Sequence, residues 1–143
     1  AMKPDGGEML ASNAGSNAIS ILSPYTDEVS TTVPVGGGPV EALVTRDSTR
    51  GYVANAASDN VTVVDIENRK ILAAVPAGAG PFRLALTADE RFLLVLNARS
   101  NDLAVIRARA NPVSLFTILP VGLGPSDLAV KAVERKAAVA SRQ

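Results

Sequence analysis

The chain has 143 residues, of which 47% are hydrophobic, and this length supports one hydrophobic core better than two separate domains. Lysine plus arginine and aspartate plus glutamate each number 14, so no net positive field gathers nucleic acid or anionic lipid. No window approaches the roughly 18 uncharged apolar residues that a membrane-spanning helix needs. The lack of cysteine excludes disulfides and thiolate metal sites, and the lack of histidine removes the commonest general base.

A repeat of 42 residues organises the chain. Each repeat contains an aspartate, then an asparagine eight positions later, and a Gly-Pro pair at the start of the next repeat. The asparagines are 42 residues apart, whereas the Gly-Pro pairs are 42 and then 44 apart because two extra residues lie within 112–119. Three markers in phase indicate that one structural unit recurs. They are Asp5, Asn13, Gly38-Pro39, Asp47, Asn55, Gly80-Pro81, Asp89, Asn97 and Gly124-Pro125.

The repeat divides the chain into four units. The sequence begins with Ala1-Met2-Lys3 part-way through a repeat, so we expect these first residues to be an added cloning remnant in front of an internal boundary. The expected units are a partial one at 4–34, whole ones at 35–76 and 77–120, and a partial one at 121–141.

Each whole unit contains four short apolar bursts with alternation, and none sustains a helical period. In the first whole unit the expected strands are 40–45, 50–55, 61–66 and 70–75. Four short antiparallel strands in about 42 residues are typical of one β-propeller blade. The sequence therefore predicts an all-β fold, a propeller fragment of about three four-stranded antiparallel blades in a single segment, 1–143.

Each marker has a local structural reason. The aspartates are expected in hairpin turns between first and second strands, where a carboxylate accepts hydrogen bonds from nearby backbone amides. The polar stretch after each asparagine is expected to loop between the second and third strands, with left-handed backbone that Asn and Asp tolerate. The Gly-rich segments before each proline are expected to lead from the outer strand of one blade to the inner strand of the next.

Residues 52–56 (YVANA) and 60–65 (NVTVVD) resemble the YVTN repeat of bacterial and archaeal surface-layer and lactonase-like propellers. The pattern covers residues 4–141, and it departs from the motif in the outer repeats. There the tyrosine position holds Leu10, Leu94 and Ala138, and the last asparagine position holds Ser141. The resemblance implies a propeller of prokaryotic type in an extracytoplasmic location, namely periplasmic, secreted or on the cell surface.

The strand count predicts an incomplete ring. Three strands in the opening unit, four in each whole unit and two at the end give thirteen, whereas propellers close with four to eight blades. Such a fragment would leave apolar sheet edges exposed. We therefore expect either that it belongs to a larger propeller or that it closes by homodimerisation, with the tail of one copy completing the first blade of another.

The candidate ligand-binding residues follow the Gly-Pro links, where the loops are expected to open beside a central channel. Glu41, Arg83 and Asp127 occupy one phase in successive units, and Phe82 precedes Arg83. Three different charged groups at one phase favour a channel rim tuned to a ligand. The alternatives are a solvated loop for the charged residues and a core position for Phe82.

Other polar residues are expected to have structural roles. The turn aspartates recur in three copies, as a structural role predicts, and no Gly-rich link has the pattern of a phosphate-binding loop. Tyr52, Phe92 and Leu94 are expected to pack blade against blade. The sequence thus indicates no catalytic residue, no metal site and no cofactor.

Three functional interpretations follow. The leading one is a non-enzymatic binding or scaffold module, similar to surface-layer-associated proteins, whose partners are a second copy, the missing blades of a parent chain, or a protein or small-molecule ligand. The second is a lactonase-like or quinoprotein-like enzyme with a site in the central channel that this segment holds only in part. The third assigns the segment no activity by itself.

Overall fold

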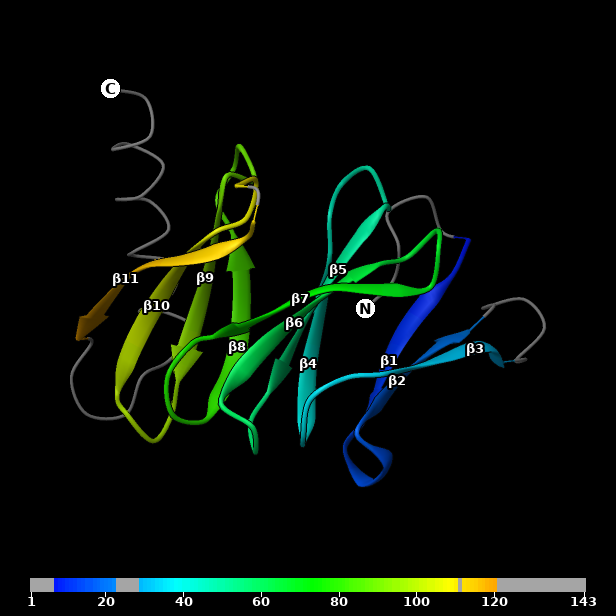
Figure 1. Cartoon of the computed structure of the whole chain (residues 1–143), viewed down its shortest axis with the longest axis horizontal. Coiled ribbons are helices and arrows are strands. Elements are labelled where there is room, and N and C mark those ends of the chain that lie inside the picture. The colour runs from blue at the N-terminus through cyan, green and yellow to red at the C-terminus, as the bar shows by residue number, and fades with distance from the viewer. Residues whose placement is uncertain (1–6, 23–28, 111, 121–143) are drawn as a thin grey trace.

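The computed structural model describes residues 7–22, 29–110 and 112–120, which form three antiparallel β-sheets (Figure 1). The first sheet has three strands, and the other two have four each. Within these residues the only helix is a short 3-10 turn, η1 (Ala14–Ser16), and no helix is long and apolar enough to cross a membrane. The strands are β1 (Met9–Asn13), β2 (Ala18–Leu22), β3 (Val29–Pro34), β4 (Pro39–Val44), β5 (Arg50–Asn55), β6 (Asn60–Asp65), β7 (Lys70–Pro76), β8 (Pro81–Leu86), β9 (Phe92–Asn97), β10 (Asp102–Arg107) and β11 (Ser114–Pro120).

Each sheet is a meander in which strands that follow one another in sequence lie side by side. We call the sheets blade 1 (β1–β3), blade 2 (β4–β7) and blade 3 (β8–β11). The blades follow chain order across the molecule, from blue to orange in Figure 1. This all-β arrangement confirms the predicted fold class, and the observed strands of blade 2 lie within one residue of the predicted ones. The predicted unit at 121–141 lies outside the described residues.

Strict alternation along the central strands builds the core. In β5, Tyr52 and Ala54 face blade 3, whereas Val53 between them packs with blade 1. This follows from the two-residue period of a strand, and it means that both faces of blade 2 are buried. The interface between blades 2 and 3 includes Tyr52, Val61, Val63, Leu93, Val95 and Ile106, all fully buried. The expected packing role of Tyr52 is therefore confirmed.

The loops carry left-handed backbone at repeating positions. In the β1–β2, β5–β6 and β9–β10 loops, Asn17, Asp59 and Asn101 have φ values of 53°, 57° and 51°. These residues are 42 apart, and they confirm that the loops use the Asn and Asp tolerance for this conformation. In the turns between the first two strands, Ser48 and Glu90 have φ values of 63° and 58°.

Candidate functional site

Two of the predicted rim residues meet between the inner strands of blades 2 and 3. Glu41 lies on β4 and Arg83 on β8, and these strands pack on each other. Glu41 Oε2 accepts a hydrogen bond from the backbone N–H of Leu84 at 2.8 Å, while Glu41 Oε1 lies 3.5 Å from Arg83 Nη1. The carboxylate thus satisfies a backbone donor of the neighbouring blade. Its side chain is 26% exposed, compared with 47% for Arg83.

The other two candidates are placed differently. Phe82 is half-buried and packs against the buried cluster formed by Leu94, Leu96, Leu103 and Val105, on the face of blade 3 turned away from blade 2. The Arg83 guanidinium lies 6.0 Å from the centre of the Phe82 ring. Asp127 lies outside the described residues. The structure therefore joins Glu41 to Arg83 and directs Phe82 toward apolar side chains.

A second set of contacts between blades lies in the β1–β2 and β5–β6 loops. Asn17 Oδ1 accepts a hydrogen bond from the Gly38 N–H at 3.1 Å, and Asp59 Oδ1 accepts one from the Gly80 N–H at 2.9 Å. Each acceptor belongs to one blade and each donor to the link entering the next, 21 residues later. The left-handed backbone of Asn17 and Asp59 directs their side chains to these links.

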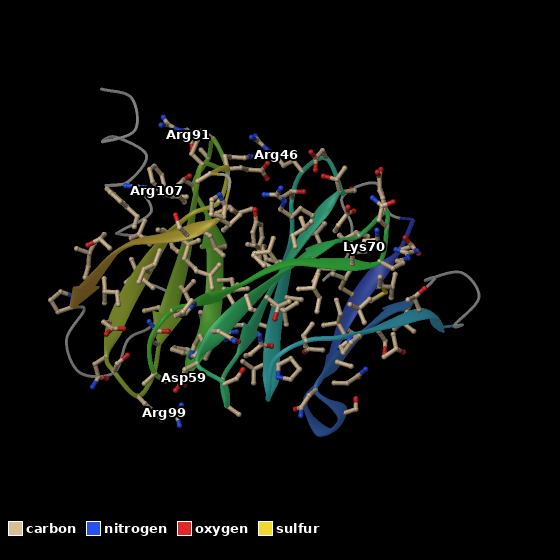
Figure 2. The ribbon with its side chains drawn as sticks, in the orientation of Figure 1. Arg46, Asp59, Lys70, Arg91, Arg99 and Arg107 are labelled. Carbon is tan, nitrogen blue, oxygen red and sulfur yellow. The ribbon has the colours of Figure 1, made fainter. Side chains whose placement is uncertain are left out.

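Asp59 is also paired with an arginine from blade 3. Arg99 Nη2 contacts Asp59 Oδ1 and donates to the Ala56 carbonyl at 3.2 Å. Figure 2 shows the pair at the bottom of the view, at the end of the sheets that carries the β5–β6 and β9–β10 loops. The hydrogen bond from Gly80, helped by Arg99, holds the pKa of Asp59 below its usual value. The charged carboxylate is therefore the form suited to this contact between blades.

At the opposite end of the sheets, a buried carboxylate joins blades 2 and 3. Glu90 is 6% exposed and lies in the β8–β9 turn. Its Oε2 accepts from the Arg46 N–H at 2.9 Å, and its Oε1 accepts from Arg109 Nη2 at 2.8 Å. A second arginine contact crosses the same interface, because Arg50 donates to the Ala108 carbonyl at 2.8 Å. Hydrogen bonds of this kind are what make a buried carboxylate tolerable.

The asparagine marker of blade 3 holds the start of the link between blades 2 and 3. Asn97 Nδ2 donates to the Ala77 carbonyl at 3.1 Å and to Asp102 Oδ1 at 2.8 Å. Asn55, its equivalent in blade 2, donates to Asn60 Oδ1 and Thr62 Oγ1. A Cβ added to Gly78 would lie 2.5 Å from Asn97 Nδ2, so only glycine lets the link lie this close to the amide.

The turn aspartates bind their own turns. Asp47 Oδ1 accepts from the Thr45 hydroxyl at 2.6 Å and from both the N–H and the hydroxyl of Thr49. Asp89 Oδ1 accepts from the Thr87 hydroxyl and the Arg91 N–H in the same way. These hydrogen bonds lower the pKa of Asp47 from 3.8 to about 2. The structural interpretation of Asp47 and Asp89 is confirmed, and Asp5 lies outside the described residues.

The described part of the chain therefore uses its prominent polar groups for architecture. It contains no group of three or more acidic side chains that could hold a metal ion. Burial raises the pKa of Tyr52, which fits its place in the core between blades. The ion pair of Arg69 with Glu8, at 2.7 Å, likewise joins blade 2 to blade 1.

Sequence reasoning missed Asp59, Glu90 and Arg99 as contacts between blades. The sequence did contain one indication for Asp59, because this residue occupies the same position in its repeat as Asn17, 42 residues earlier. The partners could not be found in this way, because Arg99 lies 40 residues from Asp59 and Arg46 lies 44 from Glu90.

No protein-family model matches the sequence, and no curated protein matches it. The structure is similar to that of the hydrazine synthase of Kuenenia stuttgartiensis, with a TM-score of 0.80 and 27% identity, over 87% of this chain and 36% of that one. It is also similar to the dihydro-heme d1 dehydrogenase NirN in complex with DHE, with a TM-score of 0.66 and 27% identity, over 84% of this chain and 25% of that one.

A third similar structure is a candidate 6-phosphogluconolactonase of Bacteroides uniformis ATCC 8492, with a TM-score of 0.74 and 16% identity, over 87% of this chain and 41% of that one. The chain thus spans well under half of each of these three structures. Together with the three successive antiparallel blades, these similarities show that the chain has a β-propeller-type fold.

Proposed function

We propose that this chain is a non-enzymatic binding or scaffold module, a segment of a YVTN-type β-propeller similar to surface-layer-associated proteins and located outside the cytoplasm. The observation that carries the proposal is that three carboxylates are engaged in contacts between blades. Glu41, Asp59 and Glu90, which could have served a reaction, each bind a backbone N–H of the neighbouring blade. Carboxylates held in this way stabilise the arrangement of blades.

The same proposal includes completion of the ring by further blades. The three blades of the described residues are fewer than the four to eight that close a propeller, and the similar solved chains are more than twice as long. We propose that the remaining blades come from a second copy or from a longer parent chain. Light scattering of the purified chain tests the first source: a homodimer has twice the 14.7 kDa mass of one chain. A stable monomer would contradict closure by two copies.

A propeller enzyme with a site in the central channel is the rival function. It is favoured by the 27% identity to two enzymes, a hydrazine synthase and a dihydro-heme d1 dehydrogenase. In this case the segment would supply part of a site that other blades complete, and Glu41 and Arg83 would lie at its rim.

Three measurements on the purified chain separate the two functions. They are metal analysis, a lactone-hydrolysis screen and an absorbance titration with haem. The scaffold proposal predicts no stoichiometric metal, no turnover and no saturable haem spectrum. A stoichiometric ion, a turnover lost in Glu41→Gln, or haem binding at one equivalent would favour the enzyme.

A further inference from the structure

A β-bulge recurs in the outer strand of every blade. The pairing register shifts between Ile21 and Leu22 in blade 1, and at the corresponding points of the other blades, between Val63 and Val64 and between Val105 and Ile106. The outer-strand residues left without a partner are Ser30, Leu72 and Phe116. A bulge turns a side chain away from the regular alternation, so the side chain at this position in blades 2 and 3 is aimed differently from its neighbours.

In blade 3 this position holds an exposed aromatic ring. Phe116 is 51% exposed, and its ring lies 5.8 Å from that of Phe92 on β9. The Arg107 guanidinium lies 4.6 Å from the centre of the Phe116 ring, and that of Arg91 lies 5.8 Å from the Phe92 ring. We call Arg91, Phe92, Arg107 and Phe116 the arginine–phenylalanine cluster. It assembles two of the three phenylalanines of the chain from separate strands.

The strand that carries Phe116 is apolar and lies at the edge of its sheet. β11 is the outermost strand of blade 3, and within the described residues no strand pairs with its outer side. Leu115, Ile118 and Leu119 on the same strand are 37%, 43% and 40% exposed. An exposed apolar edge strand offers unpaired backbone groups to another chain, and proteins normally avoid such an edge.

The charge beside this edge is positive. Figure 2 shows Arg91 and Arg107 at the same end of the molecule. Arg107 forms no ion pair with any of the described residues. The nearby carboxylates are already used, since Glu90 binds Arg109 and Asp89 binds its own turn. A partner that covers β11 is therefore best matched when it carries negative charge.

We propose that the outer edge of β11 and the arginine–phenylalanine cluster dock an extended acidic segment of a partner protein, which adds to blade 3 as a strand beside β11. Backbone hydrogen bonds would supply the pairing, the exposed Phe116 ring would supply apolar contact, and Arg107 would select for carboxylates. A second copy of this chain is a poorer match, because neither β7 (KILAAVP) nor β11 (SLFTILP) contains an acidic residue.

The proposal rests on the proposed binding module and gives it a protein partner. The test uses the full chain and a fluorescently labelled nonapeptide of alternating glutamate and valine, with a lysine-valine peptide as its counterpart. Anisotropy should show saturable binding of the acidic peptide only, weakened by added salt. Phe116→Ala and Arg107→Glu should each weaken binding by about tenfold or more.

Leu72 provides a matched control, because it occupies the same bulge in blade 2 and is 49% exposed. Leu72→Ala should leave peptide binding unchanged, and circular dichroism should show that all three variants are folded. Equal binding of both peptides, or an equal loss on Leu72→Ala, would overturn the proposal. So would light scattering that shows a dimer lost on Phe116→Ala, since a second copy would then cover this edge. A scaffold without this docking edge would still pass the metal, lactone and haem tests above.

Discussion

Glu41 and Leu84 are joined across a blade boundary, where the carboxylate on the inner strand of blade 2 accepts the backbone N–H on the inner strand of blade 3 at 2.8 Å. An inner strand has one side that its own sheet does not pair, and here a neighbouring side chain satisfies one of the unpaired donors. The contact explains why a charged residue at this phase need not mark a binding site.

We expect Glu41→Ala to lower the free energy of unfolding by about 1–3 kcal/mol, because it leaves the Leu84 N–H without its charged acceptor. Glu41→Gln should cost less, since the amide oxygen can still accept this hydrogen bond. Urea denaturation measures both. Arg83→Ala is the control, and it should change stability by less than about 1 kcal/mol because its ion pair with Glu41 is partly exposed. If Arg83→Ala costs more than Glu41→Ala, the ion pair outweighs the backbone contact and the account of Glu41 is wrong.

Asp47 should make the free energy of unfolding depend on pH in the acidic range. Its pKa in the folded chain, about 2, lies below the ordinary value of 3.8, so its stabilising effect is complete above about pH 5 and is lost as the pH falls toward 2. We expect Asp47→Asn to be less stable than the parent chain at neutral pH and to lose less stability on acidification. Denaturation from about pH 5 to about pH 2 checks this. The pKa values of Asp59 and Asp65 are also lowered, and both residues remain in the two proteins, so their contributions cancel. Parallel pH profiles would contradict the proposed role of the turn hydrogen bonds.

Gly78→Ala should be destabilising by about 1–3 kcal/mol. The backbone φ of Gly78 is +141°, and a Cβ there would lie 2.5 Å from Asn97 Nδ2. Gly15→Ala is the matched control, because an added Cβ meets nothing within 4 Å, and we expect a change within about 0.5 kcal/mol. Thermal melting of the two variants compares them directly. Equal melting temperatures would show that the link between blades 2 and 3 does not need glycine.

Asn97→Ala should cost about 2–4 kcal/mol, because it removes two donated hydrogen bonds at a fully buried position. Asn97→Asp should cost more near neutral pH, since it places a carboxylate beside the Ala77 carbonyl and Asp102. Acidification should restore part of this loss, because a protonated carboxyl can donate. Chemical denaturation at two pH values measures the effect, and an aspartate variant as stable as the parent would contradict the assigned amide orientation.

The fold could be predicted from the sequence because the features that indicate it are local and recur along the chain. The spacing of Asn13, Asn55 and Asn97 gave the unit length, and the short apolar bursts gave the strands of blade 2 to within one residue. The turn role of Asp47 could also be predicted, since its partners lie two residues away on either side. Each of these features either involves residues close together in the chain or recurs at a fixed spacing.

The contacts between blades could not be predicted in the same way. Leu84 lies 43 residues from Glu41, and their meeting depends on how one blade is rotated against the next. The direction of Phe116 was hidden for a different reason, because a bulge interrupts the alternation from which side-chain direction is inferred. Ligand binding by Glu41, Phe82, Arg83 and Asp127 stays a prediction.

Native-state hydrogen exchange tests the central claim most directly, namely that polar side chains of each blade hold the next one in place. Gly38, Leu84, Gly80 and Arg46 each donate a backbone N–H to a side chain of the neighbouring blade. We predict that all four amides are protected, and that Glu41→Ala removes protection at Leu84 while leaving the others intact. Exchange of these amides at the rate of an unstructured chain would contradict the account.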